Sequence, residues 1–282
     1  MNHAQDEGTN LTGQVAIVTG SGRGIGRAIA LGLARAGCSV AVVARSADQL
    51  AETVRQITQL DRRAISVAAD VSDPGAVERM VREVEESLGS VDVLVNNAGL
   101  AGPIGPTWET APEDWWRCLE VNLRGPMLCS RAVLPGMIAR GGGRIVNVAS
   151  GAGAFAIPYL GAYVTSKTAL IRFTEVLALE AAAHGIKVFA IEPGTVRTSM
   201  ADSALESEAG KRWMPWFGDV FQRGDDVPPD HAADLVVLLA SGRADALSGR
   251  FFTIKDDVVG LAERAGAEGL GDLQTLRLIQ EG

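Results

Sequence analysis

A tyrosine and a lysine lie four residues apart in the segment YVTSK, at Tyr163 and Lys167. On a helix, this spacing places both side chains on one face. A phenol has an unperturbed pKa of about 10, which makes it a poor acid or base at neutral pH unless its surroundings change that value. A nearby ammonium group favours the phenolate and lowers the pKa. The pair therefore predicts a tyrosine whose proton is controlled by Lys167. The alternative is an ordinary pair of surface residues.

Two further polar residues accompany this pair. Ser150 follows an apolar run and lies thirteen positions before Tyr163, and Asn122 lies in the segment VNLRG. Taken alone, a serine after a strand often caps the next turn, and a buried asparagine often makes a structural hydrogen bond. We include both as candidate catalytic residues because they occur in register with the other motifs of the chain.

A glycine-rich segment, TGSGRGIG, runs from Thr19 to Gly26 directly after an apolar run. Glycines permit a tight turn and let backbone N–H groups approach a phosphate, and the start of a helix adds partial positive charge. The strand–turn–helix context is the one that a dinucleotide-binding fingerprint requires. A turn that merely packs a helix on a strand is the alternative.

The end of the second apolar run indicates the cofactor. An acidic residue there would bind a ribose 2′-hydroxyl and indicate NAD, whereas an arginine suits a 2′-phosphate. The sequence reads VVARSAD, with Arg45 at this place, and Arg23 in the glycine turn adds a second cation. We therefore favour NADP(H), with NAD(H) as the alternative in which both arginines are solvated surface residues.

The elements that must position these residues alternate along the chain. Continuous apolar runs predict strands over residues 15–19, 39–44, 63–70, 91–96, 143–150, 186–193 and 249–254. Amphipathic runs predict helices over residues 24–37, 47–60, 72–89, 113–140 with a bend at Pro126, a run that contains Tyr163, and 229–241. Alternation without hairpin signals is typical of an α/β fold. We predict a Rossmann-type doubly wound parallel sheet of about seven strands, flanked by helices on both faces.

This pattern indicates one main domain. We expect a flexible N-terminal tail over residues 1–12, a single dinucleotide-binding and catalytic domain over residues 13–255, and a C-terminal extension over residues 256–282. Residues 98–112 and 195–228 look irregular, and the second segment is the expected substrate loop. Both follow strands at the edge where ligands bind in such sheets.

Composition and charge restrict the class of protein. The chain has 282 residues, 47% of them hydrophobic, and a formal net charge of -8. A nucleic-acid partner would call for a basic face, and no such excess occurs. The first residues lack the pattern of a signal peptide, and no apolar run reaches the length of a membrane span. We expect a soluble cytoplasmic protein without a nucleic-acid or membrane partner.

Cysteine and histidine spacing argues against a disulfide framework or a metal site. The three cysteines, Cys38, Cys118 and Cys129, are far apart and fit free thiols in a reducing compartment. The three histidines are scattered, so we predict no metal. The chain also lacks the GxSxG motif of a hydrolase elbow and the GxxxxGK[ST] motif of a P-loop.

Taken in order, these motifs resemble the short-chain dehydrogenase/reductase family. They are TGxxxGxG at Gly20, Gly24 and Gly26, NNAG at residues 96–99, Asn122, Ser150, YxxxK at Tyr163 and Lys167, and PGTVRT at residues 193–198. Each motif is modest alone, but the ordered set is specific and covers about residues 13–255.

The resemblance implies roles for single residues. Lys167 would hold the nicotinamide ribose hydroxyls, Ser150 would orient the substrate oxygen, and Asn122 would hold a water that links Lys167 to solvent. Asp70 matches the family's adenine contact. The expected cofactor-binding residues are Gly20, Ser21, Gly22, Arg23, Gly24, Ile25, Gly26, Arg45, Asp70, Val71, Asn97, Ala98, Gly99, Tyr163, Lys167, Pro193, Gly194, Val196 and Thr198. Family members also form tetramers through the two long helices, so we expect a homo-oligomer, a tetramer or a dimer.

The expected activity is an NAD(P)(H)-dependent interconversion of a secondary alcohol and a ketone, with Tyr163 as general acid/base. Large apolar residues near the irregular segments suggest a small apolar or cyclic substrate, bound by Ser150, Tyr163, Trp213 and Trp216. They are Trp108, Phe155, Leu160, Trp213, Trp216 and Phe217. A subunit contact is the alternative for this cluster.

Two other functions deserve comparison. A catalytically silent, dinucleotide-binding regulatory protein need not retain the full set of Asn122, Ser150, Tyr163 and Lys167. A sugar-nucleotide epimerase also uses a tyrosine, a lysine and a nicotinamide. The TGxxxGxG spacing and the short region after the sixth strand argue against it.

Overall fold

The structure is a computed structural model that describes residues 9–267 and 270–277. Its centre is a sheet of seven parallel strands in the order β3-β2-β1-β4-β5-β6-β7. The strands are β1 (Val15–Thr19), β2 (Ser39–Ala44), β3 (Ala64–Ala68), β4 (Val93–Asn96), β5 (Gly143–Val148), β6 (Ile186–Glu192) and β7 (Phe251–Thr253). The order reverses between β1 and β4, and ligands of open α/β sheets bind beyond the carboxyl ends of the strands at such a point.

The inner strands are apolar along their whole length. Every residue of β1 and of β4 is buried, as expected where helices cover both faces of a parallel sheet. The register places Val18 beside Val42 of β2 and Val95 of β4, so the turns after these three strands lie next to each other. The predicted Rossmann-type doubly wound sheet is confirmed.

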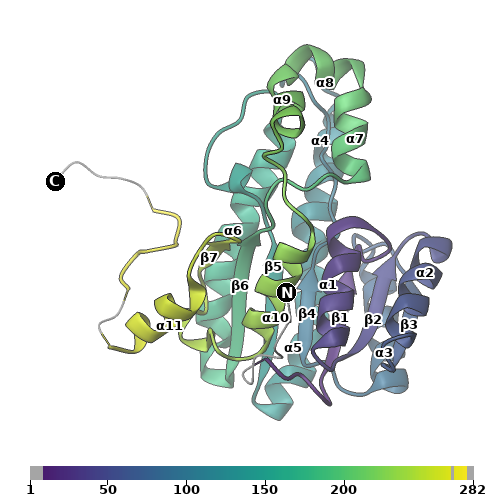
Figure 1. Cartoon of the computed structure of the whole chain (residues 1–282), viewed down its shortest axis with the longest axis vertical. Coiled ribbons are helices and arrows are strands. Elements are labelled where there is room, and N and C mark those ends of the chain that lie inside the picture. The colour runs from purple at the N-terminus through teal and green to yellow at the C-terminus, as the bar shows by residue number, and fades with distance from the viewer. Residues whose placement is uncertain (1–8, 268–269, 278–282) are drawn as a thin grey trace.

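Helices cover both faces of the sheet (Figure 1). One face carries α1 (Gly24–Arg35), α2 (Ala47–Thr58) and α10 (Asp230–Ala240). The other carries α3 (Pro74–Leu88), α5 (Gly125–Arg140) and α6 (Gly161–Ala181). Each face has its own hydrophobic core, which fixes the strand ends and the turns that follow them.

The helix predicted over residues 113–140 is interrupted. It consists of α4 (Pro112–Leu119), a π-helical turn (Glu120–Arg124) and α5. The predicted bend residue, Pro126, lies two positions after this turn. A proline ring clashes with the carbonyl group four residues earlier and has no N–H to offer to it. That carbonyl belongs to Asn122, which explains why the π-helical turn falls there.

The predicted irregular segment, residues 195–228, contains three short helices. They are α7 (Ser199–Glu206), α8 (Glu208–Trp213) and α9 (Pro215–Arg223). Thr198 and Ser207 cap the first two with their side-chain oxygens, and Pro215 begins the third. Such short helices contain too few turns to give a clear hydrophobic period, so the sequence did not indicate them. We call residues 199–223 the helical cap, and Figure 1 shows it beyond one end of the sheet, beside α4.

The predicted N-terminal tail over residues 1–12 is too long. Leu11 is fully buried, and its backbone N–H donates to the carbonyl of Ala36 at 2.7 Å. The polar residues around Leu11 concealed this contact, because a single apolar residue gives no periodic pattern. Residues 1–8 lie outside the described residues.

The described part of the C-terminal extension packs on the same chain. It comprises α11 (Val258–Ala267) and an extended segment, residues 270–277, which we call the C-terminal strap. The backbone N–H of Phe251 on β7 donates to the carbonyl of Gln274 at 2.9 Å. Glu175 on α6 accepts from the backbone N–H of Leu276 at 2.8 Å. The strap therefore lies along the outer edge of β7 and beside α6.

Within residues 9–267 and 270–277, no helix is both long and apolar enough to cross a membrane. In the same residues, His, Cys, Asp and Glu side chains form no group of three that could hold a metal ion.

Candidate active site

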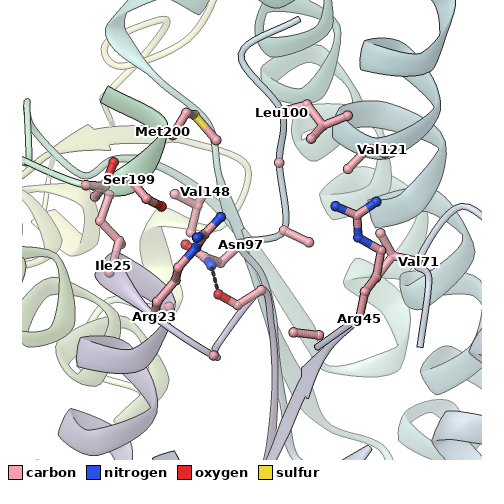
Figure 2. Close-up of a pocket in the computed structure, with 18 of the residues that line it drawn as sticks. Arg23, Ile25, Arg45, Val71, Asn97, Leu100, Val121, Val148, Ser199 and Met200 are labelled. Carbon is pink, nitrogen blue, oxygen red and sulfur yellow. Dashed lines mark hydrogen bonds between the residues drawn. The ribbon is translucent and has the colours of Figure 1, made fainter. Parts of the chain in front are cut away.

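A cavity of about 380 Å³ lies beyond the carboxyl ends of the strands (Figure 2). The turns that follow β1 to β4, the end of β5 and the segment after β6 all contribute to its lining, as do α4 and α6. These predicted cofactor-binding residues line it: Gly20, Gly22, Arg23, Gly24, Ile25, Gly26, Arg45, Asp70, Val71, Asn97, Ala98, Gly99, Tyr163, Lys167, Pro193 and Thr198. The fold thus brings most of the predicted set to one place.

The turn after β1 leaves no room for a side chain at Gly20 or at Gly26. Gly20 has a φ of +66°, and an added Cβ would lie 2.8 Å from the Cα of Ala98. An added Cβ at Gly26 would lie 2.3 Å from the carbonyl oxygen of Gly20. The Nδ2 of Asn97 donates to that carbonyl at 3.2 Å and holds the turn in place (Figure 2). Backbone at the start of α1 therefore faces the cavity, and these residues fit the pyrophosphate of a dinucleotide.

Two arginines give the cavity positive charge. Figure 2 shows the guanidinium groups of Arg23 and Arg45 directed into it from opposite sides. Both residues are exposed. Ser46 and Gln49 line the cavity next to Arg45, and their polar groups add hydrogen-bonding capacity there.

A third arginine fixes the carboxylate at the end of β3. Arg117 on α4 donates to Asp70 at 2.7 Å, and Ser72 donates to the same carboxylate through its backbone N–H and its hydroxyl. Burial raises the pKa of Asp70, but these hydrogen bonds outweigh it and hold the pKa at about 2. Asp70 is therefore ionised and held in one position at the cavity wall.

The predicted catalytic tyrosine and lysine share this wall. Tyr163 and Lys167 both line the cavity, and Ser150 lies close enough to Tyr163 to lower the pKa of its phenol. The Ser150 hydroxyl also accepts from the backbone N–H of Ala152 at 3.2 Å, which fixes the serine at the start of a short 3-10 turn, Gly151–Gly153. Ser150 does not line the cavity itself but meets Tyr163 behind it.

The expected effect of Lys167 on Tyr163 is wrong for this structure. Burial raises the pKa of Tyr163, and Ser150 only partly opposes this. The Lys167 Nζ instead donates to the carbonyl of Val148 at 2.7 Å and lies 5.7 Å from the centre of the Tyr163 ring. Helical spacing placed both groups on one face but did not reveal how deeply they are buried.

Burial also changes the lysine. Lys167 is 4% exposed, and burial lowers the pKa of its ammonium group from 10.5 to about 8. An added Cβ at Gly99 would lie 3.8 Å from its Nζ and 3.3 Å from the Oδ1 of Asn122. The lysine therefore ends close to the turn after β4 and to Asn122.

The side chain of Asn122 is fully engaged in hydrogen bonds. Its Oδ1 accepts from the backbone N–H of Leu100 at 2.8 Å, and its Nδ2 donates to the carbonyl of Leu100 at 2.9 Å and to the Oγ of Ser166 at 3.0 Å. Ser166 in turn donates to the carbonyl of Tyr163 at 2.7 Å. Asn122 is fully buried and does not line the cavity, so its side chain ties the turn after β4 to the helix of Tyr163.

The remaining predicted residues lie away from the cavity lining. The hydroxyl of Ser21 is buried and donates to the carbonyl of Val18, and neither Gly194 nor Val196 lines the cavity. Trp213 packs on Tyr159 with ring centres 4.6 Å apart, whereas Trp216 is 43% exposed and packs on Phe217 within the helical cap. Trp108 and Phe155 are exposed, and Leu160 is buried.

Sequence reasoning missed several residues of the lining. These are Ala44, Ser46, Gln49, Ala69, Leu100, Arg117, Val121, Val148, Ala149, Ser199 and Met200. Ser46 and Gln49 lie one and four positions after Arg45, so the predicted strand end was a usable signal for them. Arg117 meets Asp70 across 47 positions of sequence, and no local pattern indicates such a contact.

Fold and cavity together define a dinucleotide-binding α/β protein with a buried phenol and ammonium group beside the binding site. The family model described as short chain dehydrogenase matches residues 14–209. A short chain dehydrogenase of Pseudocercospora fijiensis is 37% identical over 275 residues, which cover 95% of this chain and 88% of that protein.

Solved structures agree with this match. The L-sorbose reductase of Gluconobacter frateurii, complexed with NADPH and L-sorbose, has a TM-score of 0.79 and 33% identity, with 89% of this chain and 98% of that chain covered. An NAD+-bound xylitol dehydrogenase has a TM-score of 0.80 and 31% identity, with 86% of this chain and 98% of that chain covered. The chain belongs to the short-chain dehydrogenase family. It is an oxidoreductase of that family, and its cofactor is a nicotinamide dinucleotide.

Proposed function

We propose that this protein is an NADP(H)-dependent oxidoreductase that interconverts a secondary alcohol and a ketone, with Tyr163 as general acid/base. The observation that carries the proposal is the joint position of Tyr163 and Lys167 on the wall of the dinucleotide cavity, with Ser150 close enough to lower the pKa of the phenol. A purely regulatory nucleotide-binding protein would not need this arrangement.

The bound nicotinamide dinucleotide supplies a hydride in reduction and accepts one in oxidation. In reduction, Tyr163 donates the phenolic proton to the forming alkoxide oxygen, and in oxidation it takes that proton back. Because burial raises the pKa of Tyr163, the phenol stays protonated at neutral pH and is ready to donate. Ser150 orients the substrate oxygen through its hydroxyl group.

Lys167 and Asn122 complete the site in different ways. We assign to the Lys167 ammonium the role of holding the ribose hydroxyls of the cofactor. In a regular helix, the backbone carbonyl of Asn122 would accept from the N–H of the residue four positions later. That residue is Pro126, which has no N–H. We assign the water-holding role to this backbone carbonyl, since the side chain of Asn122 is already engaged.

Charge supports the preference for NADP(H). Arg23 and Arg45 both point into the cavity (Figure 2), and two guanidinium groups match the geometry and charge of a 2′-phosphate. The related L-sorbose reductase was solved with NADPH and the related xylitol dehydrogenase with NAD+. Relatives of both kinds exist, so the preference rests on these two arginines.

The proposed substrate is small and apolar or cyclic. Leu100 and Met200 line the cavity, and Trp213 of the helical cap lies on Tyr159 four positions before Tyr163. We propose that the substrate enters between the helical cap and the turn after β4. The buried free thiols of Cys38, Cys118 and Cys129 fit a reducing, cytoplasmic compartment.

The first test is Tyr163→Phe, assayed by NADPH absorbance with a panel of cyclic and aromatic ketones. We expect turnover to fall by about two orders of magnitude or more, as for the loss of a general acid. The dissociation constant for NADPH, measured by fluorescence titration, should stay within about twofold because the ring is kept. Turnover near the wild-type rate would reject the acid/base assignment.

Arg45→Asp tests the cofactor preference. It places a carboxylate where the 2′-phosphate would lie, so KM for NADPH should rise by about a hundredfold and KM for NADH should change little. The matched control is Arg62→Asp, which makes the same change of charge at a residue that does not line the cavity. Equal changes for both cofactors in Arg45→Asp would contradict the proposed phosphate contact.

A further inference from the structure

A half-buried carboxylate lies directly behind the proposed catalytic serine. Glu192 is the last residue of β6, and its register partner on β7 is Thr253. The sequence motifs gave it no role, and it does not line the dinucleotide cavity. Burial raises its pKa, so holding a carboxylate here has an energetic cost that a surface glutamate does not have.

Glu192 is in close contact with the turn that carries Ser150. The backbone of Gly151 interacts with its carboxylate and lowers the pKa, against the effect of burial. An added Cβ on Gly151 would lie 2.7 Å from Oε1 and 3.1 Å from Oε2, so the carboxylate lies flat against this glycine. Any larger residue at position 151 would push the carboxylate away.

The same turn is held from its other side by the helix of Tyr163. An added Cβ on Gly153 would lie 2.9 Å from the backbone carbonyl oxygen of Lys167 and 2.8 Å from the Cδ1 of Ile171. The Gly151–Gly153 turn is thus enclosed between Glu192 and α6. Ser150 can meet Tyr163 only if the turn keeps this position.

The charges around Glu192 come from few elements. Lys255 and Asp256, in the segment after β7, act on its carboxylate with opposite signs. Asp256 is itself fixed, because it accepts from the backbone N–H of Thr253 at 2.6 Å and from the side chain of Gln274 in the C-terminal strap at 2.9 Å.

The titratable groups that face Tyr163 are Glu192, Cys118 on α4 and Lys167 on its own helix.

We propose that Glu192 is a positioning residue that holds the Ser150 turn against Tyr163 and keeps a negative charge close to the phenol. The inference rests on the proposed role of Tyr163 as general acid. The charge of Glu192 contributes to the raised pKa of Tyr163, which favours the protonated phenol that ketone reduction needs.

Two variants separate the contact from the charge. Glu192→Gln keeps an oxygen that can accept from Gly151 but removes the charge, and Glu192→Leu removes both. Glu180→Gln is the matched control, because it removes a carboxylate from an exposed position on α6. All three are compared with the full-length wild type.

Amide hydrogen exchange tests the contact without any substrate. In Glu192→Leu, we expect the peptide that covers residues 149–155 to exchange at least tenfold faster, whereas Glu192→Gln and Glu180→Gln leave it within about twofold of wild type. Unchanged exchange of this peptide in Glu192→Leu would overturn the positioning role, whatever the protein's activity.

Kinetics with the fastest ketone of the panel tests the consequence for catalysis. In Glu192→Gln, loss of the negative charge lowers the pKa of Tyr163, so the decline of kcat/KM with rising pH should begin at a lower pH than in wild type or Glu180→Gln. In Glu192→Leu, kcat should also fall by roughly tenfold to a hundredfold, because the serine is displaced. An unchanged pH profile in Glu192→Gln would reject the electrostatic part.

A double-mutant cycle identifies the route of the effect. If Glu192 acts through Ser150, adding Glu192→Leu to Ser150→Ala should lower kcat by less than about twofold. Additive losses would overturn the assignment. The proposed function has its own test, and it is rejected if Tyr163→Phe retains turnover. Even then, the exchange measurement decides whether Glu192 holds the turn.

Discussion

At the scale of single residues, the charged form of Lys167 is costly to bury. Its ammonium group is buried, and its pKa is lowered from 10.5 to about 8. Below about pH 8 the folded and unfolded states both carry the proton, and the folded state bears the cost of a buried charge. Between about pH 8 and 10.5 the unfolded state holds more protons, so this group makes the free energy of unfolding rise with pH.

Lys167→Met tests this assignment through stability. At pH 7 the variant should be more stable than wild type by roughly 3 kcal/mol, the value of the pKa shift, less the lost hydrogen bond to Val148. The difference should shrink as the pH rises from 8 to 10, as measured by urea unfolding at each pH. A difference that does not depend on pH would show that another group causes the titration.

Sequence patterns predicted the residues of the site better than their energetics. The glycine turn, Tyr163 and Lys167 could be found because each motif is contiguous and its spacing has a geometric meaning. The direction of the Tyr163 pKa could not be found, since spacing does not report burial. Arg117 was missed because its contact with Asp70 exists only after α4 and the end of β3 have come together.

At the scale of elements, an aromatic pair joins the helical cap to the segment that precedes Tyr163. Tyr159 has a φ of +67°, an unusual value for an aromatic residue, and its carbonyl accepts from the backbone N–H of Gly105 at 2.9 Å. Its ring packs on Trp213, which also lies under the guanidinium group of Arg212. Strained residues of this kind persist only where their surroundings fix them.

Trp213→Ala should therefore loosen the helical cap over the site. Because an aromatic pair contributes about 1 kcal/mol, we expect KM for the ketone to rise several-fold with the NADPH dissociation constant unchanged. Trp216→Ala is the matched control, because Trp216 packs only on Phe217 among the ring contacts of the described residues. If both variants raise KM equally, the cap acts as a whole and the pair has no special role.

Most elements could be predicted from the sequence because buried parallel strands are continuous apolar runs. The strands predicted at residues 15–19 and 39–44 are reproduced without change. The helical cap was missed because its helices have six to nine residues each and too few turns for a period. The π-helical turn needed a three-dimensional reason, the clash of Pro126 with the carbonyl of Asn122.

At the scale of the whole molecule, the two long helices leave apolar residues uncovered. Leu179 on α6 is 80% exposed, and Val176 on the same helix is exposed as well. Met127 and Ile138 on α5 are also exposed. Neither helix has a clear polar face, whereas a helix that borders solvent usually does. We propose that a second copy of this chain covers these residues, in a dimer or a tetramer.

Leu179→Glu tests this proposal by placing a charge in the proposed contact. We expect the molar mass from sedimentation equilibrium to fall by about half, since burying an unpaired carboxylate costs several kcal/mol. Leu273→Glu makes the same change at an exposed position of the C-terminal strap and should leave the mass unchanged. If both variants have the wild-type mass, this face does not form the oligomer contact.

The C-terminal strap has a consequence for the protein's behaviour in concentrated solution. Edge strands of sheets offer unpaired N–H and C=O groups to other chains and thereby initiate aggregation. Here the N–H of Phe251 already has a partner in Gln274, and Arg250 donates to the carbonyls of Leu273 and Gly271. The strap thus occupies the edge of β7 and hinders its pairing with a strand of another molecule. Its detachment on heating would make the protein prone to precipitate before the sheet unfolds.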